Sequence, residues 1–305
     1  MDRFGLIGDP IATSKSPALF GAGYHGKYTY ELIEGQVFEE SWRRFLEGFR
    51  AINVTAPFKE NAFEQVVGLA REGRGTVSGP VWKIGATNLI VKNEDGSLDA
   101  HNSDFTGIIL SIAEALFPGL VGQCYDTFGD RGYIKVHQFI RQNVEELYGR
   151  RPQALVVGCG GAGKAAAVAA AEMGFSTVLM NKTLAKAQSF ALDVASYGFI
   201  VDTISDFRAA LAECDIVIYT IPVALSAIGE LTEDDFRGEG RIPKVILEAN
   251  YRDPSFRGES LERMQRAGCR YVSGRRWLLY QALTGYGIMT GETPDFEAMD
   301  SVVKQ

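Results

Sequence analysis

A lysine and an aspartate could handle a proton together. Lys59 follows a strand-like run, Ala51 to Thr55, that breaks at Pro57, and Asp104 closes a later stretch that reads as a hairpin. If both side chains face the same space, an ammonium and a carboxylate can hold a hydroxyl and transfer a proton to an adjacent oxygen during hydride transfer. Most lysines are merely solvated, and spacing along the chain leaves this convergence open.

Two serines form a second candidate site. Ser14 and Ser16 lie in the stretch GDPIATSKSP. In an extended segment this spacing puts both hydroxyls on one side, where they can donate to one carboxylate. The alternative is structural, because Ser16 followed by Pro17 is typical of a helix N-cap with a first-turn proline. Spacing alone favours the structural interpretation.

A glycine pattern in the second half indicates a dinucleotide site. Gly158, Gly160 and Gly163 satisfy G-x-G-x-x-G directly after an apolar strand pattern and before an alanine-rich helix pattern. Glycine permits a tight turn and lets backbone N–H groups approach a pyrophosphate at the positive end of the helix. Since strand, loop, helix and second strand occur in the required order, the motif predicts dinucleotide binding.

The end of the following strand favours NADP over NAD. NAD-preferring folds usually place Asp or Glu there for the ribose 2′-hydroxyl. This chain instead has NKTLAK, which supplies Asn181, Lys182, Thr183 and Lys186. Two cations and a hydroxyl suit a 2′-phosphate, although lysines at a helix start are often only solvated, and lysine lacks the bidentate fork of arginine. The predicted cofactor is NADP.

The elements that position these residues alternate between strands and helices. In the first hundred residues this order favours a mainly parallel sheet covered by helices, followed by a hairpin that turns at Asp95-Gly96. In the second half, strand and helix patterns alternate as they do in a doubly wound sheet. Strands are expected at 4–8, 28–34, 51–55, 200–203, 215–220 and 245–248, with helices near 17 and over 40–49, 183–196 and 206–212.

The predicted fold is α/β and two-lobed. It combines an N-terminal, mainly parallel substrate domain with a Rossmann-type, doubly wound NADP-binding domain, and a chain of 305 residues is long enough for two cores. The expected boundaries are 1–104 for the substrate-binding and catalytic domain, completed by helices at 275–305, then 105–150 for connecting helices with an insertion, and 151–274 for the NADP-binding domain.

Composition argues against several classes of function. The formal net charge of −7 gives no general attraction to nucleic acid or to an anionic membrane. Four widely spaced cysteines and three histidines form neither a zinc framework nor a disulfide scaffold, so no metal is expected. No stretch approaches the ~20 apolar residues of a membrane span. The N-terminus reaches Asp9 and Pro10 before any apolar segment of signal-peptide length develops. We expect a cytoplasmic protein, monomer or homodimer, with a small-molecule substrate.

The blocks that carry these residues resemble those of one family, the shikimate and quinate dehydrogenases. GDPIATSKSP, NVTAPFKE, GATNLI, NSDFTG, GCGGAGKA, NKTLAK and YQAL are similar to that family's blocks in its order, and they span nearly the whole chain. The resemblance implies NADP-dependent reduction of 3-dehydroshikimate to shikimate, a step of aromatic amino-acid and chorismate biosynthesis. The alternatives are a quinate or related cyclitol-carboxylate dehydrogenase using NAD or NADP, and a non-catalytic NADP-binding sensor.

The resemblance also implies individual roles. Lys59 would supply a proton to the developing alkoxide, and Asp104 would accept a hydrogen bond from the neighbouring ring hydroxyl. The implied substrate-binding residues are Ser14, Ser16, Thr55, Asn88, Tyr251 and Gln281. The implied cofactor-binding residues are Gly158, Cys159, Gly160, Gly161, Ala162, Asn181, Lys182, Thr183, Lys186, Ala249 and Gly274. For the two serines this reverses the preference drawn from spacing, with a helix cap by Ser16 kept as a second expected role.

Several positions depart from the family pattern. Lys182 stands where the family often has arginine, Ser103 where threonine usually precedes the aspartate, and Glu248 where aspartate commonly stands three residues before the tyrosine. Cys159 replaces a usual alanine, and residues 118–150 exceed the usual connector length. The methyl missing at Ser103 predicts room for a bulkier ring such as quinate.

Overall fold

The computed structural model describes residues 2–238 and 242–304, which form two compact units. The first unit ends at Gly107 and resumes at Leu278, and the second comprises Ile108–Trp277. The chain therefore leaves the first unit within helix α5 (Ser103–Leu116) and returns to it within helix α13 (Gly274–Thr290). Of residues 105–150, expected as connecting helices, 105–107 belong to the first unit and 108–150 to the second.

The first unit is built on a six-stranded mixed sheet of order β2-β1-β3-β5-β6-β4. The pairs β1/β2, β1/β3 and β4/β6 are parallel, whereas β3/β5 and β5/β6 are antiparallel, so the predicted hairpin is present. The strands are β1 (Arg3–Gly8), β2 (Thr29–Glu34), β3 (Ala51–Val54), β4 (Gly75–Val77), β5 (Leu89–Lys92) and β6 (Leu98–His101).

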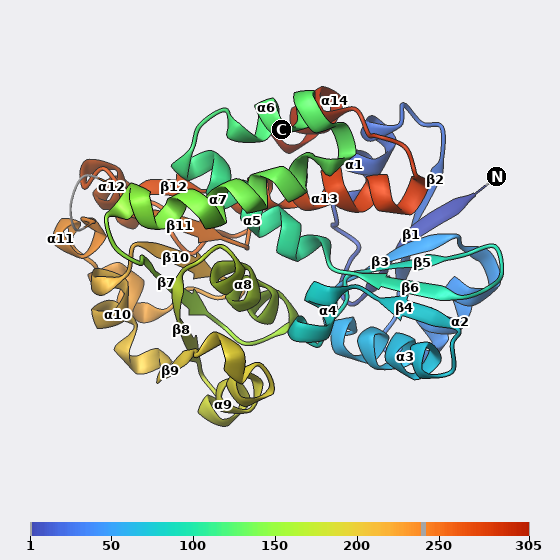
Figure 1. The fold of residues 1–305 in the computed structure, drawn as a ribbon, viewed down its shortest axis with the longest axis horizontal. Helices are drawn as coiled ribbons and strands as arrows, with labels where there is room; N and C mark the ends of the chain where they lie inside the picture. The colour runs from blue at the N-terminus through green and yellow to red at the C-terminus, as the bar shows by residue number, and fades with distance from the viewer. Residues whose placement is uncertain (1, 239–241, 305) are drawn as a thin grey trace. The chain divides into compact units, whose positions relative to one another are not determined.

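Helices cover both faces of this sheet (Figure 1). One face packs its apolar side chains against α2, α3 and α4, with Phe45 and Ile52 fully buried. The other packs against α1 and α13 through an aromatic cluster that includes Phe4, Phe20 and Tyr286. The helices are α1 (Ser16–Gly23), α2 (Phe38–Gly48), α3 (Lys59–Arg71), α4 (Gly79–Ile84) and α14 (Phe296–Lys304). The sequence analysis did not predict α3, β4 or α4.

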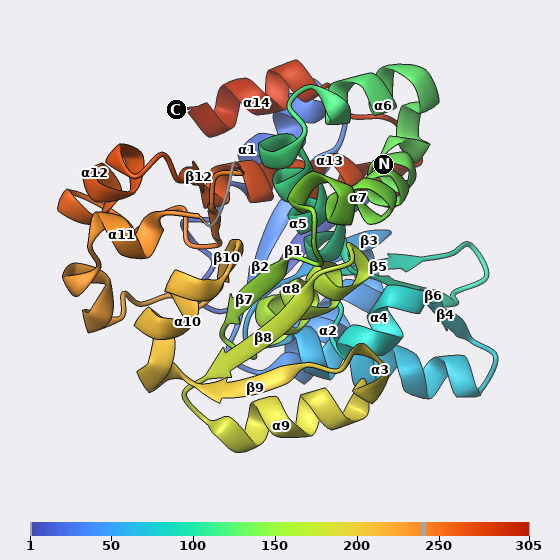
Figure 2. The ribbon, with the colours of Figure 1, turned by 60° about the vertical axis from the view of Figure 1, so that its left-hand side comes forward.

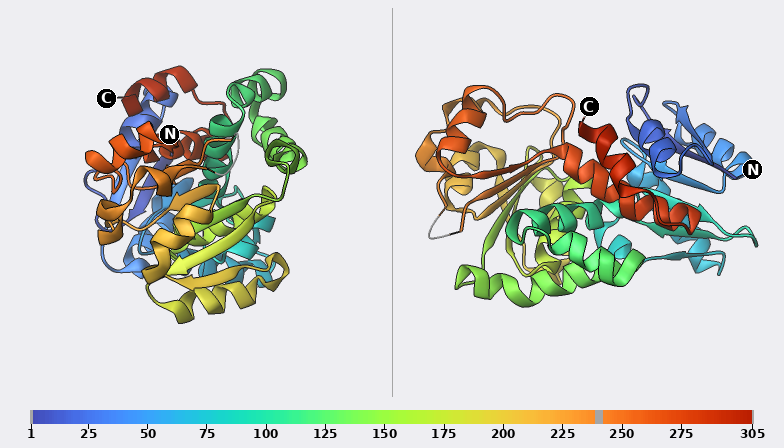
Figure 3. Two further views of the ribbon diagram at one scale, coloured as in Figure 1. Left: turned by 90° about the vertical axis from the view of Figure 1, so that its left-hand side faces the viewer. Right: turned by 90° about the horizontal axis from the view of Figure 1, so that it is seen from above.

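The second unit contains a six-stranded sheet of order β12-β11-β10-β7-β8-β9, in which every pair is parallel. Its twist is visible in the yellow-green strands of Figure 3. The strands are β7 (Gln153–Val157), β8 (Ser176–Asn181), β9 (Ile200–Thr203), β10 (Ile216–Tyr219), β11 (Val245–Glu248) and β12 (Arg270–Val272). The strands follow chain order outward from β7 in one direction and outward from β10 in the other, which is the doubly wound arrangement. The predicted fold class is therefore confirmed.

Helices α10, α11 and α12 cover one face of the second sheet, and α8 packs on the other (Figure 2). Eight of the 12 residues of the alanine-rich α8 are buried, and its last carbonyl, that of Glu172, accepts hydrogen bonds from His137 and Arg141 of α7. The helices are α6 (Leu120–Phe128), α7 (Gly132–Tyr148), α8 (Gly161–Glu172), α9 (Leu184–Asp193), α10 (Phe207–Glu213), α11 (Glu233–Phe236) and α12 (Glu259–Arg266). Over the described ranges, no helix combines the length and apolarity needed to cross a bilayer.

Candidate active site

Lys59 and Asp104 meet in the first unit. Lys59 is the first residue of α3, and Asp104 lies in the first turn of α5. The Lys59 Nζ donates to Asp104 Oδ2 at 2.5 Å, with the two side chains 14% and 8% exposed. The convergence that sequence spacing left open is therefore present, and the pair is poised to hold a hydroxyl and exchange a proton with it.

Backbone contacts and helix ends fix this pair. The carbonyl of Lys59 accepts the N–H of Thr87 at 3.0 Å, which ties the start of α3 to the segment before β5. The partial positive charge at a helix N-terminus favours the Asp104 carboxylate and disfavours the Lys59 ammonium. Asp104 therefore supplies the negative charge that Lys59 needs at this position.

Asn88 connects the neighbouring predicted residues. Its Oδ1 accepts the Ser103 N–H at 2.7 Å, and its Nδ2 lies 3.1 Å from Ser103 Oγ and 3.3 Å from Gln281 Oε1. Ser103 is 2% exposed, and a Cβ added at Gly285 of α13 would lie 3.2 Å from its Cβ. Ser103 thus holds Asn88 in place, and the added room for a quinate ring stays a prediction.

The two predicted serines lie side by side. Ser14 Oγ donates to Ser16 Oγ at 3.1 Å, and the Ser16 N–H donates to Ser14 Oγ at 3.2 Å. The expected helix cap by Ser16 is wrong, because α1 begins at Ser16 itself and its N-cap position is Lys15, without a capping side chain. The Ser16 hydroxyl is instead hydrogen-bonded to Ser14.

The remaining predicted substrate residues, Thr55 and Tyr251, belong to different units. Thr55 follows β3, and its N–H donates to the Ile7 carbonyl at 2.9 Å. A Cβ added at Gly8 would lie 2.4 Å from Thr55 Cγ2, so only glycine fits at the end of β1. Tyr251 belongs to the second unit, where its hydroxyl accepts from Arg252 Nε at 3.4 Å.

The glycine loop of the second unit has the shape that a dinucleotide requires. Gly158 adopts φ +107°, and its N–H donates to the Met180 carbonyl at 2.7 Å. A Cβ added at Gly163 would lie 2.0 Å from the Gly158 oxygen, whereas one added at Gly160 would meet nothing within 4 Å. The loop is thus closed on its inner side and open at Gly160, where a pyrophosphate can approach the start of α8.

Asn181 ties this loop to the next one. Its Oδ1 accepts the Cys159 N–H at 3.2 Å, and its Nδ2 donates to the Thr183 carbonyl at 2.9 Å. Lys182, Thr183 and Lys186 are exposed around the start of α9. The end of β8 therefore offers cations and an amide where NAD-preferring folds usually place a carboxylate.

The remaining predicted cofactor residues also lie in this unit. Gly161 and Ala162 open α8 directly after the loop. A Cβ added at Gly274 would lie 2.4 Å from the carbonyl oxygen of Ala249, so the start of α13 and the end of β11 touch through their backbones. The predicted cofactor residues thus gather at the carboxyl ends of β7, β8 and β11, where open α/β sheets bind ligands.

Glu248 is a buried carboxylate that shapes the loop carrying Tyr251. It is 0% exposed, and its carboxylate accepts the N–H groups of Ser255 at 2.5 Å and Phe256 at 3.4 Å, and the Tyr271 hydroxyl at 2.8 Å. Burial raises the pKa of Tyr271 well above its ordinary value, so this phenol remains a proton donor. Glu248, which stands where the family commonly has the shorter aspartate, therefore has a structural role in this loop.

Replacing Glu248 with alanine is expected to lower the free energy of unfolding by about 3 kcal/mol, because buried donors would lose a charged acceptor. Urea denaturation would measure this loss. Glu259→Ala is the matched control, since Glu259 is 83% exposed and forms a surface pair with Arg263, worth under about 1 kcal/mol. Equal urea midpoints for the two variants would contradict the structural role of Glu248.

The sequence analysis missed Tyr30 and Asn53. Tyr30 Oη donates to Asn53 Oδ1 at 2.8 Å, and Asn53 Nδ2 donates to the Asn88 carbonyl at 3.3 Å. Asn53 carried a usable signal, because an amide within the otherwise apolar strand AINV needs hydrogen-bond partners. Tyr30 carried none, since tyrosine is common in strands.

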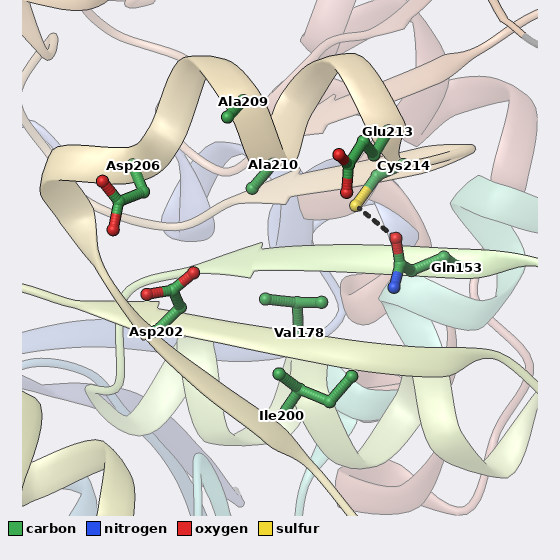
Figure 4. A pocket seen from close by; sticks show the side chains of 9 residues that line it. All are labelled: Gln153, Val178, Ile200, Asp202, Asp206, Ala209, Ala210, Glu213 and Cys214. Carbon is green, nitrogen blue, oxygen red and sulfur yellow. Dashed lines mark hydrogen bonds between the residues drawn. The ribbon is translucent and has the colours of Figure 1, made fainter.

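A separate hollow of about 240 Å³ lies in the second unit (Figure 4). None of the predicted site residues lines it, and its charged groups are carboxylates of β9, the turn after it and the end of α10. The lining residues are Gln153, Val178, Ile200, Asp202, Asp206, Ala209, Ala210, Glu213 and Cys214. Within the described ranges, no group of His, Cys, Asp and Glu side chains is arranged to hold a metal ion.

Two sequence families match the chain. Residues 6–90 match the shikimate dehydrogenase substrate binding domain, and residues 139–230 match shikimate/quinate 5-dehydrogenase, so that the matched ranges together span more than half of the chain. Among curated proteins, the shikimate dehydrogenase (NADP(+)) of Natronomonas pharaonis is 27% identical over 311 residues, which cover 100% of this chain and 99% of that protein.

Solved structures share the fold. Shikimate 5-dehydrogenase from Thermus thermophilus, solved in complex with NADP(H) and shikimate, aligns with a TM-score of 0.72 and 23% identity over 100% of this chain and 99% of that one. Quinate dehydrogenase from Corynebacterium glutamicum, solved in complex with NAD, aligns with a TM-score of 0.72 and 20% identity over 99% and 98%. At these identities the likeness is one of fold.

Proposed function

Because the chain belongs to the shikimate and quinate dehydrogenase family, we propose that it is an NADP-dependent shikimate dehydrogenase. It reduces 3-dehydroshikimate to shikimate reversibly, in the shikimate pathway of aromatic amino-acid biosynthesis. The observation that carries the chemistry is the ion pair of Lys59 and Asp104, with Nζ and Oδ2 2.5 Å apart and little exposed. A sensor that only binds NADP would not need this pair.

Lys59 and Asp104 have complementary roles in this proposal. NADPH, when bound, supplies the hydride to the ring ketone. The Lys59 ammonium donates a proton to the ketone oxygen as it becomes an alkoxide, so that no free anion builds up. Asp104 accepts a hydrogen bond from the neighbouring ring hydroxyl and keeps Lys59 in position. In the oxidation of shikimate, the neutral lysine takes the proton back.

The remaining polar residues of the first unit bind and orient the ring. The hydroxyls of Ser14 and Ser16 donate to the substrate carboxylate, a role that their 3.1 Å separation supports because one carboxylate can accept from both. Thr55, Asn88 and Gln281 contact the carboxylate or the ring hydroxyls. Tyr251 supplies a further hydroxyl from the second unit. These assignments make residues 1–107 and 278–305 the substrate-binding domain.

The second unit is the NADP-binding domain in this proposal. The loop from Gly158 to Ala162 would hold the pyrophosphate, and the open side of Gly160 supports this because a Cβ there meets nothing within 4 Å. Asn181, Lys182, Thr183 and Lys186 would hold the adenosine phosphate. Ala249 and Gly274 would lie near the nicotinamide, where their close backbone contact leaves no room for a side chain at position 274.

The direct test is turnover, followed by the absorbance of reduced nicotinamide. We expect the purified protein to reduce NADP with shikimate as the substrate. The rate should be lower when NAD replaces NADP, or when quinate replaces shikimate. Turnover of quinate equal to that of shikimate would support the prediction drawn from Ser103 and shift the assignment within the family. Silence with both substrates and both cofactors would refute the proposed function.

The choice of cofactor gives a separate prediction. Replacing both Lys182 and Lys186 with alanine is expected to raise the KM for NADP about tenfold, because two exposed cations would no longer face the 2′-phosphate. The KM for NAD should change little, since NAD lacks this phosphate. Lys135→Ala, which removes an exposed lysine of α7, is the control. An equal rise for both cofactors in the double variant would contradict the assignment.

We further propose that the enzyme works in the cytoplasm as a monomer or homodimer. All four cysteines are buried and free, which suits a reducing compartment. Light scattering of the purified protein would give its oligomeric state, and fractionation of cells would give its location.

A further inference from the structure

Asn102 is a buried amide beside the candidate active site, and the proposed function gives it no role. It lies directly before α5 and is 6% exposed. Its Oδ1 accepts the N–H of Phe105 at 3.2 Å, and its Nδ2 donates to the carbonyl of Ala86 at 2.9 Å. One side chain therefore joins the first turn of α5 to the segment 85–88, which connects α4 to β5.

These two partners fix the orientation of the Asn102 amide. A backbone N–H donates and a backbone carbonyl accepts, so Oδ1 must face Phe105 and Nδ2 must face Ala86. The first contact is a helix N-cap, in which a side-chain oxygen accepts the N–H of the third helical residue. The second contact has no part in capping, since serine and aspartate cap helices equally well without an amide nitrogen. The bond to Ala86 therefore calls for a separate explanation.

The segment 85–88 is bonded to Lys59 as well. The N–H of Thr87, the residue after Ala86, donates to the Lys59 carbonyl at 3.0 Å. Asp104 lies in the first turn of α5, shortly after Asn102. Through Ala86 and Thr87, this segment ties the start of α3 to the start of α5. These two helix starts carry the ion pair in which Nζ and Oδ2 lie 2.5 Å apart.

A second amide from the same segment holds the other side of Asp104. The Oδ1 of Asn88 accepts the Ser103 N–H at 2.7 Å, so the N–H groups of the residues before and after Asp104 are both bonded to asparagine side chains. Asn88 is also a proposed substrate residue. Asn102 by contrast bonds to backbone groups and is nearly inaccessible, so a bound substrate leaves its two hydrogen bonds intact.

We propose that Asn102 is a positioning residue for the proton-transfer pair. By tying α5 to the segment that is bonded to Lys59, it sets the distance between the Asp104 carboxylate and the Lys59 ammonium. A displacement of about 1 Å at a reacting group can slow a reaction by about 100-fold, so this distance governs the rate. The kinetic part of this inference rests on the proposed function, whereas the link between the two helix starts does not.

Asn102→Ser tests the proposal, because serine keeps the helix cap and is too short to reach the Ala86 carbonyl. We expect kcat for shikimate oxidation to fall about tenfold, the effect of one buried hydrogen bond, with the KM for NADP changed less than about twofold. Asn102→Ala, which loses both contacts, should be no faster. A role as a helix cap alone predicts the wild-type kcat for Asn102→Ser, and that result would overturn the proposal.

Asn102→Asp provides a second variant should the serine variant fail to fold. Aspartate has the size of asparagine and caps a helix equally well, but its second oxygen cannot donate to the Ala86 carbonyl. We expect kcat to fall in this variant too. Wild-type kcat in Asn102→Asp would contradict the proposal in the same way.

Thr232→Ala is the matched control for the loss of a helix cap. The hydroxyl and N–H of Thr232 both donate to Asp235 Oδ2 at 2.7 Å at the start of α11, in the second unit. Its removal should lower the urea midpoint and leave kcat unchanged. A fall in kcat equal to that of Asn102→Ser would assign both losses to general destabilisation and overturn the positioning role.

A double-mutant cycle on Lys59 and Asp104 measures the positioning without turnover. Urea unfolding of the parent, Lys59→Met, Asp104→Asn and the double variant gives the coupling between the two side chains. We expect this coupling to fall by about half or more when the parent is Asn102→Ser. Equal coupling in the wild-type and Asn102→Ser parents would overturn the positioning role.

The two readouts keep this inference distinct from the proposed function. An inactive wild type whose Lys59–Asp104 coupling falls in the Asn102→Ser parent would refute the dehydrogenase and support the positioning of the pair. An active enzyme with unchanged coupling and wild-type kcat in Asn102→Ser would overturn the positioning role alone. An inactive wild type with unchanged coupling would overturn both.

Discussion

Replacing Lys59 with alanine is expected to lower kcat for shikimate oxidation by about 10³-fold, because general acid–base catalysis typically contributes 10²–10⁴-fold. The KM for NADP should remain near its wild-type value, since the proposed cofactor residues belong to the second unit. The rate of NADP reduction would measure this effect. Lys92→Ala is the control, because the Lys92 Nζ donates to the Leu46 carbonyl and has no role at the site.

Loss of stability must be separated from loss of chemistry in this experiment. Lys59→Ala leaves Asp104, whose side chain is 8% exposed, without its partner, and an orphaned buried charge costs several kcal/mol. The double variant Lys59→Met/Asp104→Asn removes both charges and should recover much of the urea midpoint. It should remain inactive. Activity that returned together with stability would contradict a direct role of Lys59.

Gly163→Ala is expected to disrupt the glycine loop itself. The added Cβ would lie 2.0 Å from the Gly158 oxygen and 2.6 Å from its carbonyl carbon, and a backbone group cannot rotate away as a side chain can. Overpacking of this kind typically costs about 1–3 kcal/mol. We expect a lower thermal midpoint and an affinity for NADP reduced by about 100-fold, since displacement of the loop removes the N–H groups from the pyrophosphate.

Gly160→Ala provides the matched comparison within the same loop. Its Cβ would meet nothing within 4 Å, and its φ of −86° suits any residue, so the thermal midpoint should stay unchanged. Its affinity for NADP should fall nonetheless, because the methyl would stand where the pyrophosphate approaches. Full affinity in Gly160→Ala would contradict the placement of the pyrophosphate, and a stable Gly163→Ala would contradict the packing of the loop.

The sequence determined the parts of this protein that depend on neighbouring residues. The strands at 200–203 and 245–248 were predicted with the bounds that the structure has, since runs of apolar residues between turn signals are local features. The doubly wound order of the second unit was predicted from alternation, and the glycine loop from its spacing together with the strand and helix patterns around it. Local patterns also identified Lys59 and Asp104 as candidates.

Only the tertiary structure decided which of these groups meet. Strand β3 pairs with β1 on one side and β5 on the other, which brings Asn53 opposite Leu89 and beside Asn88. This order places Tyr30 of β2 within reach of Asn53, so that the Tyr30 hydroxyl donates to the Asn53 amide oxygen. The expected cap by Ser16 failed for a local reason, because α1 begins at Ser16 itself and the Ser16 hydroxyl pairs with Ser14. Hydrogen-bond partners far apart in the chain depend on strand order and register, and no local pattern encodes them.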